Sequence, residues 1–268
     1  MLRDITLGQY FPTESPVHRL DPRYKIVMAM LYMIMIFSGD SAICLAIGFV
    51  YTVIAVSLTR ISLKVYYKSI KPMFPFLLFT ALLNILFIRD GDIYFHWNFI
   101  KITSEGVNTS IFMIVRIILL LAGTSVLTYS TSPIVLTDAI ERLLSPLKKI
   151  KFPVHELAMM MSIALRFIPV LIEETNKIIS AQKARGAEFD SGNIVAKAKS
   201  LIPVLVPLLI SSFRRAEELA TAMECRCYNG GEGRTRLRQM KSGTADYIAL
   251  SVTVLFLIVS KIAEMKLK

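Results

Sequence analysis

Two arginines set between small residues are the side chains whose type and spacing best fit a chemical role in this sequence. The first stands in Ala184-Arg185-Gly186 and the second in Cys225-Arg226-Cys227. The tetrad Ile-Pro-Val-Leu precedes each of them, at residues 168–171 and 202–205. A guanidinium presents five N–H donors in a rigid fork, which suits pairing with carboxylates or with helix-end carbonyls. The repetition predicts recognition of a partner at two places.

The other reactive side chains form no pattern that is typical of catalysis or metal binding. His18, His96 and His155 are scattered over different loops, and Cys225-x-Cys227 without a second pair is half a zinc site. The glycine-rich run at residues 230–234 lacks the lysine and the preceding strand of a phosphate-binding loop. No serine or cysteine has a base nearby in a motif. We therefore expect no catalytic residue, no metal and no cofactor in this chain.

The composition indicates an integral membrane protein. Of the 268 residues, 54% are hydrophobic and 19% are charged, and the mean hydropathy is +0.56. The net charge of +11 is explained by the positive-inside rule and by contact of cations with anionic headgroups of the lipid bilayer. Because no nucleic-acid-binding module is present, we expect no nucleic-acid partner.

Five apolar blocks predict an all-α polytopic protein with about five transmembrane helices. They lie at residues 26–37, 43–58, 72–88, 107–129 and 247–259. The first two blocks are short and could instead form a re-entrant hairpin. The lead-in before residue 26, rich in proline, is expected to be non-helical, and residues 89–106 are expected to form an outside loop. Arg116, inside the fourth block, must face protein or snorkel, because an exposed charge there is costly.

Charge bias predicts the orientation in the cell membrane. The loop at residues 60–71 holds four cations and no acidic residue, whereas the turn at residues 38–41 has no cation. The N-terminus is therefore expected on the cytoplasmic side. Residues 131–243 carry 17 Lys or Arg and 11 Asp or Glu, and they are expected to form a cytoplasmic bundle of amphipathic coupling helices.

The predicted domain organisation has three parts. Residues 1–130 hold the lead-in and four transmembrane helices, residues 131–243 the coupling helices, and residues 244–268 the last transmembrane helix. A rival interpretation makes residues 157–172 and 201–213 cross the membrane as well. It would bury Arg166 and place Arg185 outside, against the charge bias.

Two long helices must position the arginines. The first is expected to run from Glu156, bend at Pro169 and end at Arg185, with Gly186 as its cap. The second is expected to run from Ala196 to Arg226. An arginine at a helix C-terminus is stabilised by the helix dipole, so a plain solvated cap is the alternative to a docking role. A self-contained secondary transporter or an intramembrane enzyme remains the alternative for the whole chain.

Four segments resemble a known family. They are His18-Arg19-Leu20-Asp21-Pro22-Arg23, residues 165–169 (Leu-Arg-Phe-Ile-Pro), residues 181–187 (Ala-Gln-Lys-Ala-Arg-Gly-Ala) and residues 212–220 (Ser-Phe-Arg-Arg-Ala-Glu-Glu-Leu-Ala). The sequence is similar over nearly its whole length to the transmembrane scaffold, or T component, of energy-coupling factor (ECF) importers of vitamins and metal ions.

The resemblance implies a non-catalytic subunit of an ATP-driven importer. Two ABC ATPase subunits would bind the ATP and magnesium, and a small substrate-binding membrane subunit would bind the cargo. In this family two Ala-Arg-Gly motifs on cytoplasmic coupling helices dock on the ATPases, which implies that role for Ala184, Arg185 and Gly186 and for Cys225, Arg226 and Cys227. The two cysteines depart from the usual small flanks of the second motif.

Overall fold

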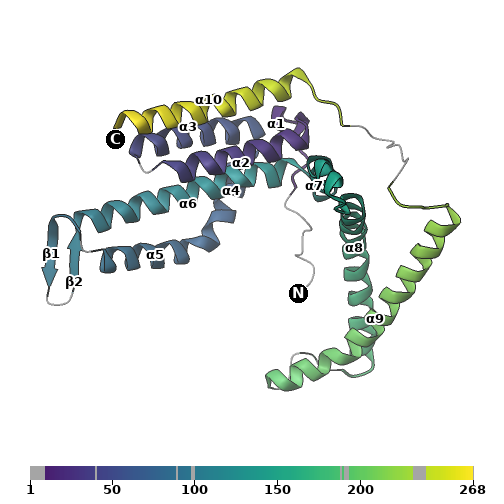
Figure 1. Ribbon diagram of the computed structural model, residues 1–268. Helices are drawn as coiled ribbons and strands as arrows, with labels where there is room; N and C mark the ends of the chain where they lie inside the picture. The colour runs from purple at the N-terminus through teal and green to yellow at the C-terminus, as the bar shows by residue number, and fades with distance from the viewer. Residues whose placement is uncertain are drawn as a thin grey trace. The chain divides into compact units, whose positions relative to one another are not determined.

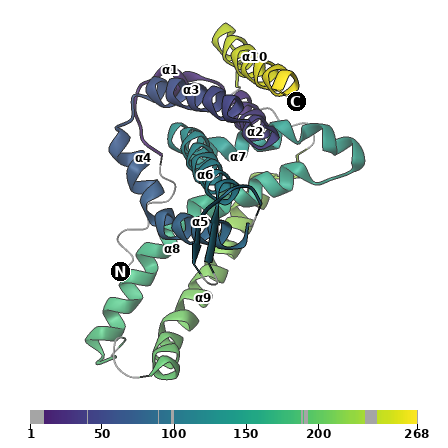
Figure 2. The same ribbon diagram turned by 90° about the vertical axis from the view of Figure 1, so that its left-hand side faces the viewer.

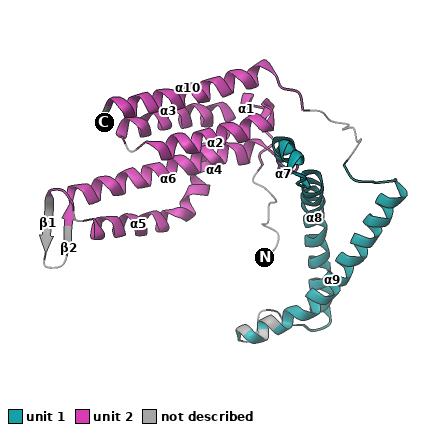
Figure 3. Ribbon diagram, in the orientation of Figure 1, with its two compact units in different colours: residues 1–7, 137–239 teal, residues 8–136, 240–268 magenta. Residues whose placement is uncertain are grey.

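The chain divides into two compact units (Figure 3). Unit 2 comprises residues 8–136 and 240–268, and unit 1 comprises residues 137–239 with residues 1–7. The computed structural model describes residues 10–39, 41–88, 90–97, 100–187, 189, 193–231 and 240–267.

Unit 2 is a bundle of apolar helices with one β-hairpin at its edge (Figure 1). Its elements are α1 (Pro16–Arg19), α2 (Pro22–Ser38), α3 (Ala42–Thr59), α4 (Leu63–Ile70), η1 (Lys71–Met73), α5 (Phe74–Phe87), β1 (Ile93–Trp97), β2 (Ile100–Thr103), α6 (Ser104–Ser130) and α10 (Thr244–Leu267). Unit 1 holds η2 (Ser145–Ile150), α8 (Val154–Ala184) and α9 (Ile194–Cys225), and the boundary falls within α7 (Pro133–Leu143).

Among the residues that the structure describes, five helices are long and apolar enough to cross a membrane, which confirms an all-α, multi-pass membrane protein. Four of them match predicted spans: α3, the α4–α5 segment, α6 and α10. The fifth is α8, which was predicted to lie outside the membrane. The predicted first span corresponds to α2, which has 17 residues and is shorter than the roughly 20 residues that a crossing needs. Length and composition alone therefore do not separate the two interpretations of α8.

One local prediction was wrong, and one pair of strands was not predicted. The lead-in contains α1, because Ser15 accepts a hydrogen bond from the backbone N–H of His18 and Pro16 fits the first helical position. The predicted outside loop contains the antiparallel pair of β1 and β2. Both segments are rich in β-branched and aromatic residues, which favour strands. The sequence analysis did not use this signal.

The core of unit 2 centres on α2, which packs against α3, α6 and α10. Tyr32 is 2% exposed, and its hydroxyl is hydrogen-bonded to Thr52 Oγ1 and to the carbonyl of Leu119, each at 2.7 Å. A Cβ added to Gly123 would lie 2.3 Å from the Tyr32 ring, so glycine is what lets α6 approach α2. Membrane helices are held by such close packing and by interhelical hydrogen bonds, because lipid is as apolar as the side chains.

Polar side chains hold the helix ends of unit 2. Lys25 Nζ, at the start of α2, donates to the carbonyl of Ser130 at 3.0 Å. At the other end of α2, Arg116 donates to the carbonyl of Gly39 at 2.7 Å, and Lys261 donates to the carbonyl of Ser38 at 3.3 Å. Arg116 thus faces protein, one of the two placements expected for it, and the terminal carbonyls of α2 receive the partners that a helix C-terminus lacks.

Candidate functional site: two arginine tips

The arginine motifs lie on α8 and α9, which pack against each other within unit 1 (Figure 2). Gln182 Nε2 donates to the carbonyl of Pro203 at 3.3 Å, and Arg215 pairs with Glu174 at 3.1 Å. The bond from the higher-numbered residue of α8, Gln182, goes to the lower-numbered residue of α9, Pro203, and the reverse holds for Glu174 and Arg215. The two helices therefore run antiparallel. Their C-terminal tips therefore lie at opposite ends of the pair.

Two prolines explain why the helices join where they do. In an unbroken helix the carbonyl of Pro203 would accept the N–H of residue 207, but residue 207 is a proline and has no N–H. The freed carbonyl is the one to which Gln182 donates. The proline pair at positions 203 and 207, four residues apart, was the signal in the sequence for this contact, and sequence reasoning did not use it.

The two helices end in the same hydrogen-bonded cap. Arg185 is the C-cap residue of α8; the N–H of Gly186 bonds to the carbonyl of Lys183 at 3.0 Å, and that of Ala187 to the carbonyl of Gln182, also at 3.0 Å. This pair of bonds is the Schellman motif, which satisfies the last carbonyls of a helix.

The second tip repeats the motif bond for bond. Arg226 is the C-cap residue of α9; the N–H of Cys227 bonds to the carbonyl of Glu224 at 2.8 Å, and that of Tyr228 to the carbonyl of Met223 at 3.0 Å. Each arginine therefore has the same place relative to the axis of its own helix. The duplication noticed in the sequence is a duplication of backbone structure.

The residue after each arginine adopts a left-handed conformation. Gly186 has φ +88° and Cys227 has φ +53°. Glycine accepts this conformation freely, whereas a side chain with a Cβ is strained there by about 1–2 kcal/mol. Cys227 thus occupies the position of Gly186, and Cys225, the last residue of α9, occupies that of Ala184, the last residue of α8. The cysteine flanks leave the form of the second tip unchanged.

The six residues of the two motifs are all exposed, and within the described residues no hydrogen bond or ion pair holds the side chain of Arg185 or Arg226. Arg226 lies 23 residues along α9 from Pro203, beside which the end of α8 is bonded. At 1.5 Å per residue this places the two arginines roughly 35 Å apart. Two exposed forks this far apart can bind two separate sites.

The described residues offer no competing site for a metal. Among them, no group of three or more His, Cys, Asp or Glu side chains could hold an ion.

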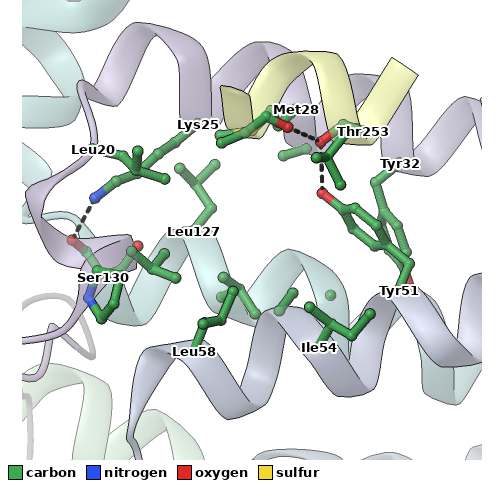
Figure 4. A pocket seen from close by; sticks show the side chains of 18 of the residues that line it. Leu20, Lys25, Met28, Tyr32, Tyr51, Ile54, Leu58, Leu127, Ser130 and Thr253 are labelled. Carbon is green, nitrogen blue, oxygen red and sulfur yellow. Dashed lines mark hydrogen bonds between the residues drawn. The ribbon is translucent and has the colours of Figure 1, made fainter. Parts of the chain in front are cut away.

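A cavity of about 410 Å³ lies among α2, α3, α6 and α10, lined mainly by apolar side chains (Figure 4). Lys25 and Ser130 lie at one end, and Tyr32, Tyr51 and Thr253 lie at the other. A carrier requires ionisable groups near the midplane of its spans, and among the described residues the only ionisable groups that line this cavity are Lys25 and two tyrosines whose hydroxyls are hydrogen-bonded to protein.

Comparison with known proteins identifies the family. The profile of the CbiQ family, described as Cobalt transport protein, matches residues 13–237. The chain is 51% identical over 257 residues to the "Energy-coupling factor transporter transmembrane protein EcfT" of Ruminiclostridium cellulolyticum, covering 96% of each chain. It is 46% identical over 256 residues to the protein of that name in Bacillus subtilis, covering 95% of this chain and 97% of the relative.

A more divergent relative is matched from end to end. The protein of the same name in Lactococcus lactis is 40% identical over 266 residues, which cover 98% of this chain and 100% of the relative. The similarity to ECF transporter scaffolds that the motifs indicated is thereby confirmed. The chain belongs to the EcfT family of energy-coupling factor transporter transmembrane components, within the CbiQ family of cobalt transport proteins.

Proposed function

We propose that this chain is the mechanical scaffold of an ECF importer of vitamins or other micronutrients. In this proposal the Arg185 and Arg226 tips dock on two ABC ATPase subunits and transmit their closure to a small substrate-binding membrane subunit. The observation that carries the proposal is the duplicated cap, which presents an exposed arginine in the same local geometry at each end of the α8–α9 pair. A solvated cap would not require such duplication.

The distance between the tips favours two ATPase sites over one. A separation of roughly 35 Å, from the helical rise of 1.5 Å per residue, is about the diameter of a small domain. The name of the relatives, "energy-coupling factor transporter transmembrane protein", fits a subunit that is moved by ATP hydrolysis elsewhere in the complex. ATP and magnesium would be bound by the ATPases, because this sequence has no phosphate-binding loop.

An exposed apolar face on α9 supports contact with a membrane partner or lipid. Ile202, Leu209 and Phe213 are 54%, 58% and 63% exposed, and their spacing of seven and four residues places them on one face of the helix. Such a continuous apolar face is typical of an interaction surface. We assign it to the substrate-binding subunit and the adjoining bilayer.

The charge distribution of unit 2 supports a cytoplasmic N-terminus. The starts of α2 and α10 lie together, because the N–H of Asp21 donates to Asp246 at 2.7 Å. The bond from Lys25 to Ser130 brings the end of α6 to the same side. Arg23 and Lys25 lie on this side, which we infer faces the cytoplasm by the positive-inside rule.

Single substitutions at the tips test the docking role. Arg185→Ala or Arg226→Ala should weaken ATPase binding by about 2–5 kcal/mol, the usual loss when one partner of a buried charge pair is truncated. Because neither side chain is bonded to another described residue, neither substitution should alter the stability of the chain by more than about 0.5 kcal/mol. Affinity of the ATPase subunits for the chain in nanodiscs measures the first effect, and thermal unfolding measures the second.

Arg214→Ala is the matched control, since Arg214 is an exposed arginine on α9 away from the tip. Arg226→Lys keeps the charge but not the fork, so a strong loss with lysine would show that the planar geometry is recognised. Unchanged affinity and continued uptake in both tip variants would refute the proposed docking role.

A further inference from the structure

The backbone that follows Arg185 and the backbone that follows Arg226 have different surroundings. A Cβ added to Gly186, after the first arginine, would meet no atom of the described residues within 4 Å. After the second arginine, by contrast, the chain turns at Gly230, which has φ +81°, and Gly231 then packs against the ring of His155. A Cβ added to Gly231 would lie 2.6 Å from Cδ2 and 2.8 Å from Cγ of that ring. We call residues 227–231 the return segment.

His155 is itself held in place. It is the second residue of α8, and its Nδ1 lies 3.0 Å from Oε1 of Glu141, which belongs to α7. Glu141 is 7% exposed, and the side chain of His155 is 22% exposed. A buried carboxylate fixes the orientation of a histidine ring through such a bond. The ring therefore presents a fixed surface to Gly231.

The contact between Gly231 and His155 links the chain after α9 to the N-terminal end of α8. Arg215 and Gln182 join the two helices near their crossing, and a pair held only there can pivot. His155 lies 19 residues from Glu174 along α8, a lever of roughly 28 Å at 1.5 Å per residue. A contact at that distance from the crossing restricts the angle between the helices far more than another contact at the crossing would.

We propose that Glu141 and His155 are positioning residues for the Arg226 tip: by seating Gly231, they set the angle between α8 and α9 and so the separation of the two arginines. The inference rests on the proposed docking function for its consequence in transport. The geometric claim itself concerns this chain alone. Within the described residues, the chain that follows the second arginine contacts α8 at His155, and no such contact is described for the chain that follows the first.

The separation of the tips can be measured directly in the full chain. The native thiols of Cys225 and Cys227 are exposed and that of Cys44 is buried, so a spin label can be placed on Cys225 in a Cys227→Gly background, with a second label at Lys183→Cys. Electron–electron dipolar spectroscopy in nanodiscs should give one narrow distance distribution. Gly231→Val and, independently, His155→Ala should broaden or shift it.

Two controls make the test specific. Gly243→Ala changes a loop glycine whose added Cβ would meet, among the described residues, only Asp246 Oδ2 at 3.7 Å, and it should leave the distribution unchanged. Glu141→Gln keeps an oxygen that accepts from the imidazole and should retain the parent distribution, whereas Glu141→Leu should broaden it. The proposal is overturned if Gly231→Val and His155→Ala leave the distances unchanged, or if Gly243→Ala broadens them equally.

A second measurement separates this inference from the docking role. In the assembled complex, Gly231→Val and His155→Ala should each lower the rate of cross-linking from the Arg226 tip to its ATPase. Both variants should leave the rate of cross-linking from the Arg185 tip unchanged. Equal loss at both tips would contradict the positioning role. Failure of Arg226→Ala to weaken ATPase binding would refute docking, while the distance measurement in the isolated chain would still decide the geometry.

Discussion

Substitution of Asp246 should weaken the attachment of α10 to α2. One carboxylate oxygen accepts the backbone N–H of Asp21, and the other accepts that of Gly243, each at 2.7 Å. Asp21 is the N-cap residue of α2, and Gly243 directly precedes α10. A single buried side chain, 4% exposed, therefore satisfies a donor at the start of each of two neighbouring helices.

The magnitude depends on the surroundings of the two donors. In Asp246→Ala the buried N–H of Asp21 loses its partner, at a cost of about 1–3 kcal/mol, and the half-exposed N–H of Gly243 loses an ordinary hydrogen bond worth about 1 kcal/mol. The sum, about 2–4 kcal/mol, should lower Tm by roughly 4–16 °C in a chain of this size. Asp246→Asn keeps one acceptor oxygen and should cost about half as much.

Cys44 provides the assay. It is buried on α3, and its thiol bonds to the carbonyl of Ser260 on α10 at 3.4 Å, so it becomes reactive when α10 leaves the bundle. A thiol-reactive fluorophore in a Cys225→Ala, Cys227→Gly background would report this exposure during heating. The reasoning would be refuted if Asp246→Ala melted within about 2 °C of the parent, a shift that corresponds to less than about 1 kcal/mol.

Substitutions at three other single positions have defined expected outcomes. Gly123→Val should destabilise the bundle by about 1–3 kcal/mol, measured by the same thermal assay, because its side chain would overlap the Tyr32 ring. Cys227→Gly should preserve ATPase affinity, whereas Cys227→Ile should reduce it, since a β-branched residue resists the left-handed conformation at this position. Arg116→Leu should remove the hydrogen bond to the carbonyl of Gly39 and cost about 1–3 kcal/mol in thermal unfolding.

The sequence alone was enough for the fold class and for most of the spans. Runs of apolar residues near the length of a bilayer crossing are local features, so α3, α5, α6 and α10 could be found without any tertiary information. The ends of α8 and α9 could also be predicted from the sequence, because the small residues and charges that mark them lie within a few positions of each other. The α1 helix and the β-hairpin were missed, since short elements depend on caps and on strand pairing that a hydropathy pattern does not show.

The two arginine tips show most clearly what the sequence determines and what only the tertiary structure decides. It determined that Arg185 and Arg226 end apolar helices, and it left the meaning of the cysteine flanks undecided. Only the backbone shows Cys227 in the left-handed position of Gly186, because φ is set by the hydrogen bonds that close the cap and not by residue type. The antiparallel pairing, the separation of the tips and the seat of Gly231 on His155 join residues 21 to 76 positions apart. Such contacts arise when the chain folds back on itself. The proline pair at positions 203 and 207 marks a freed carbonyl, but no local pattern shows which distant side chain reaches it.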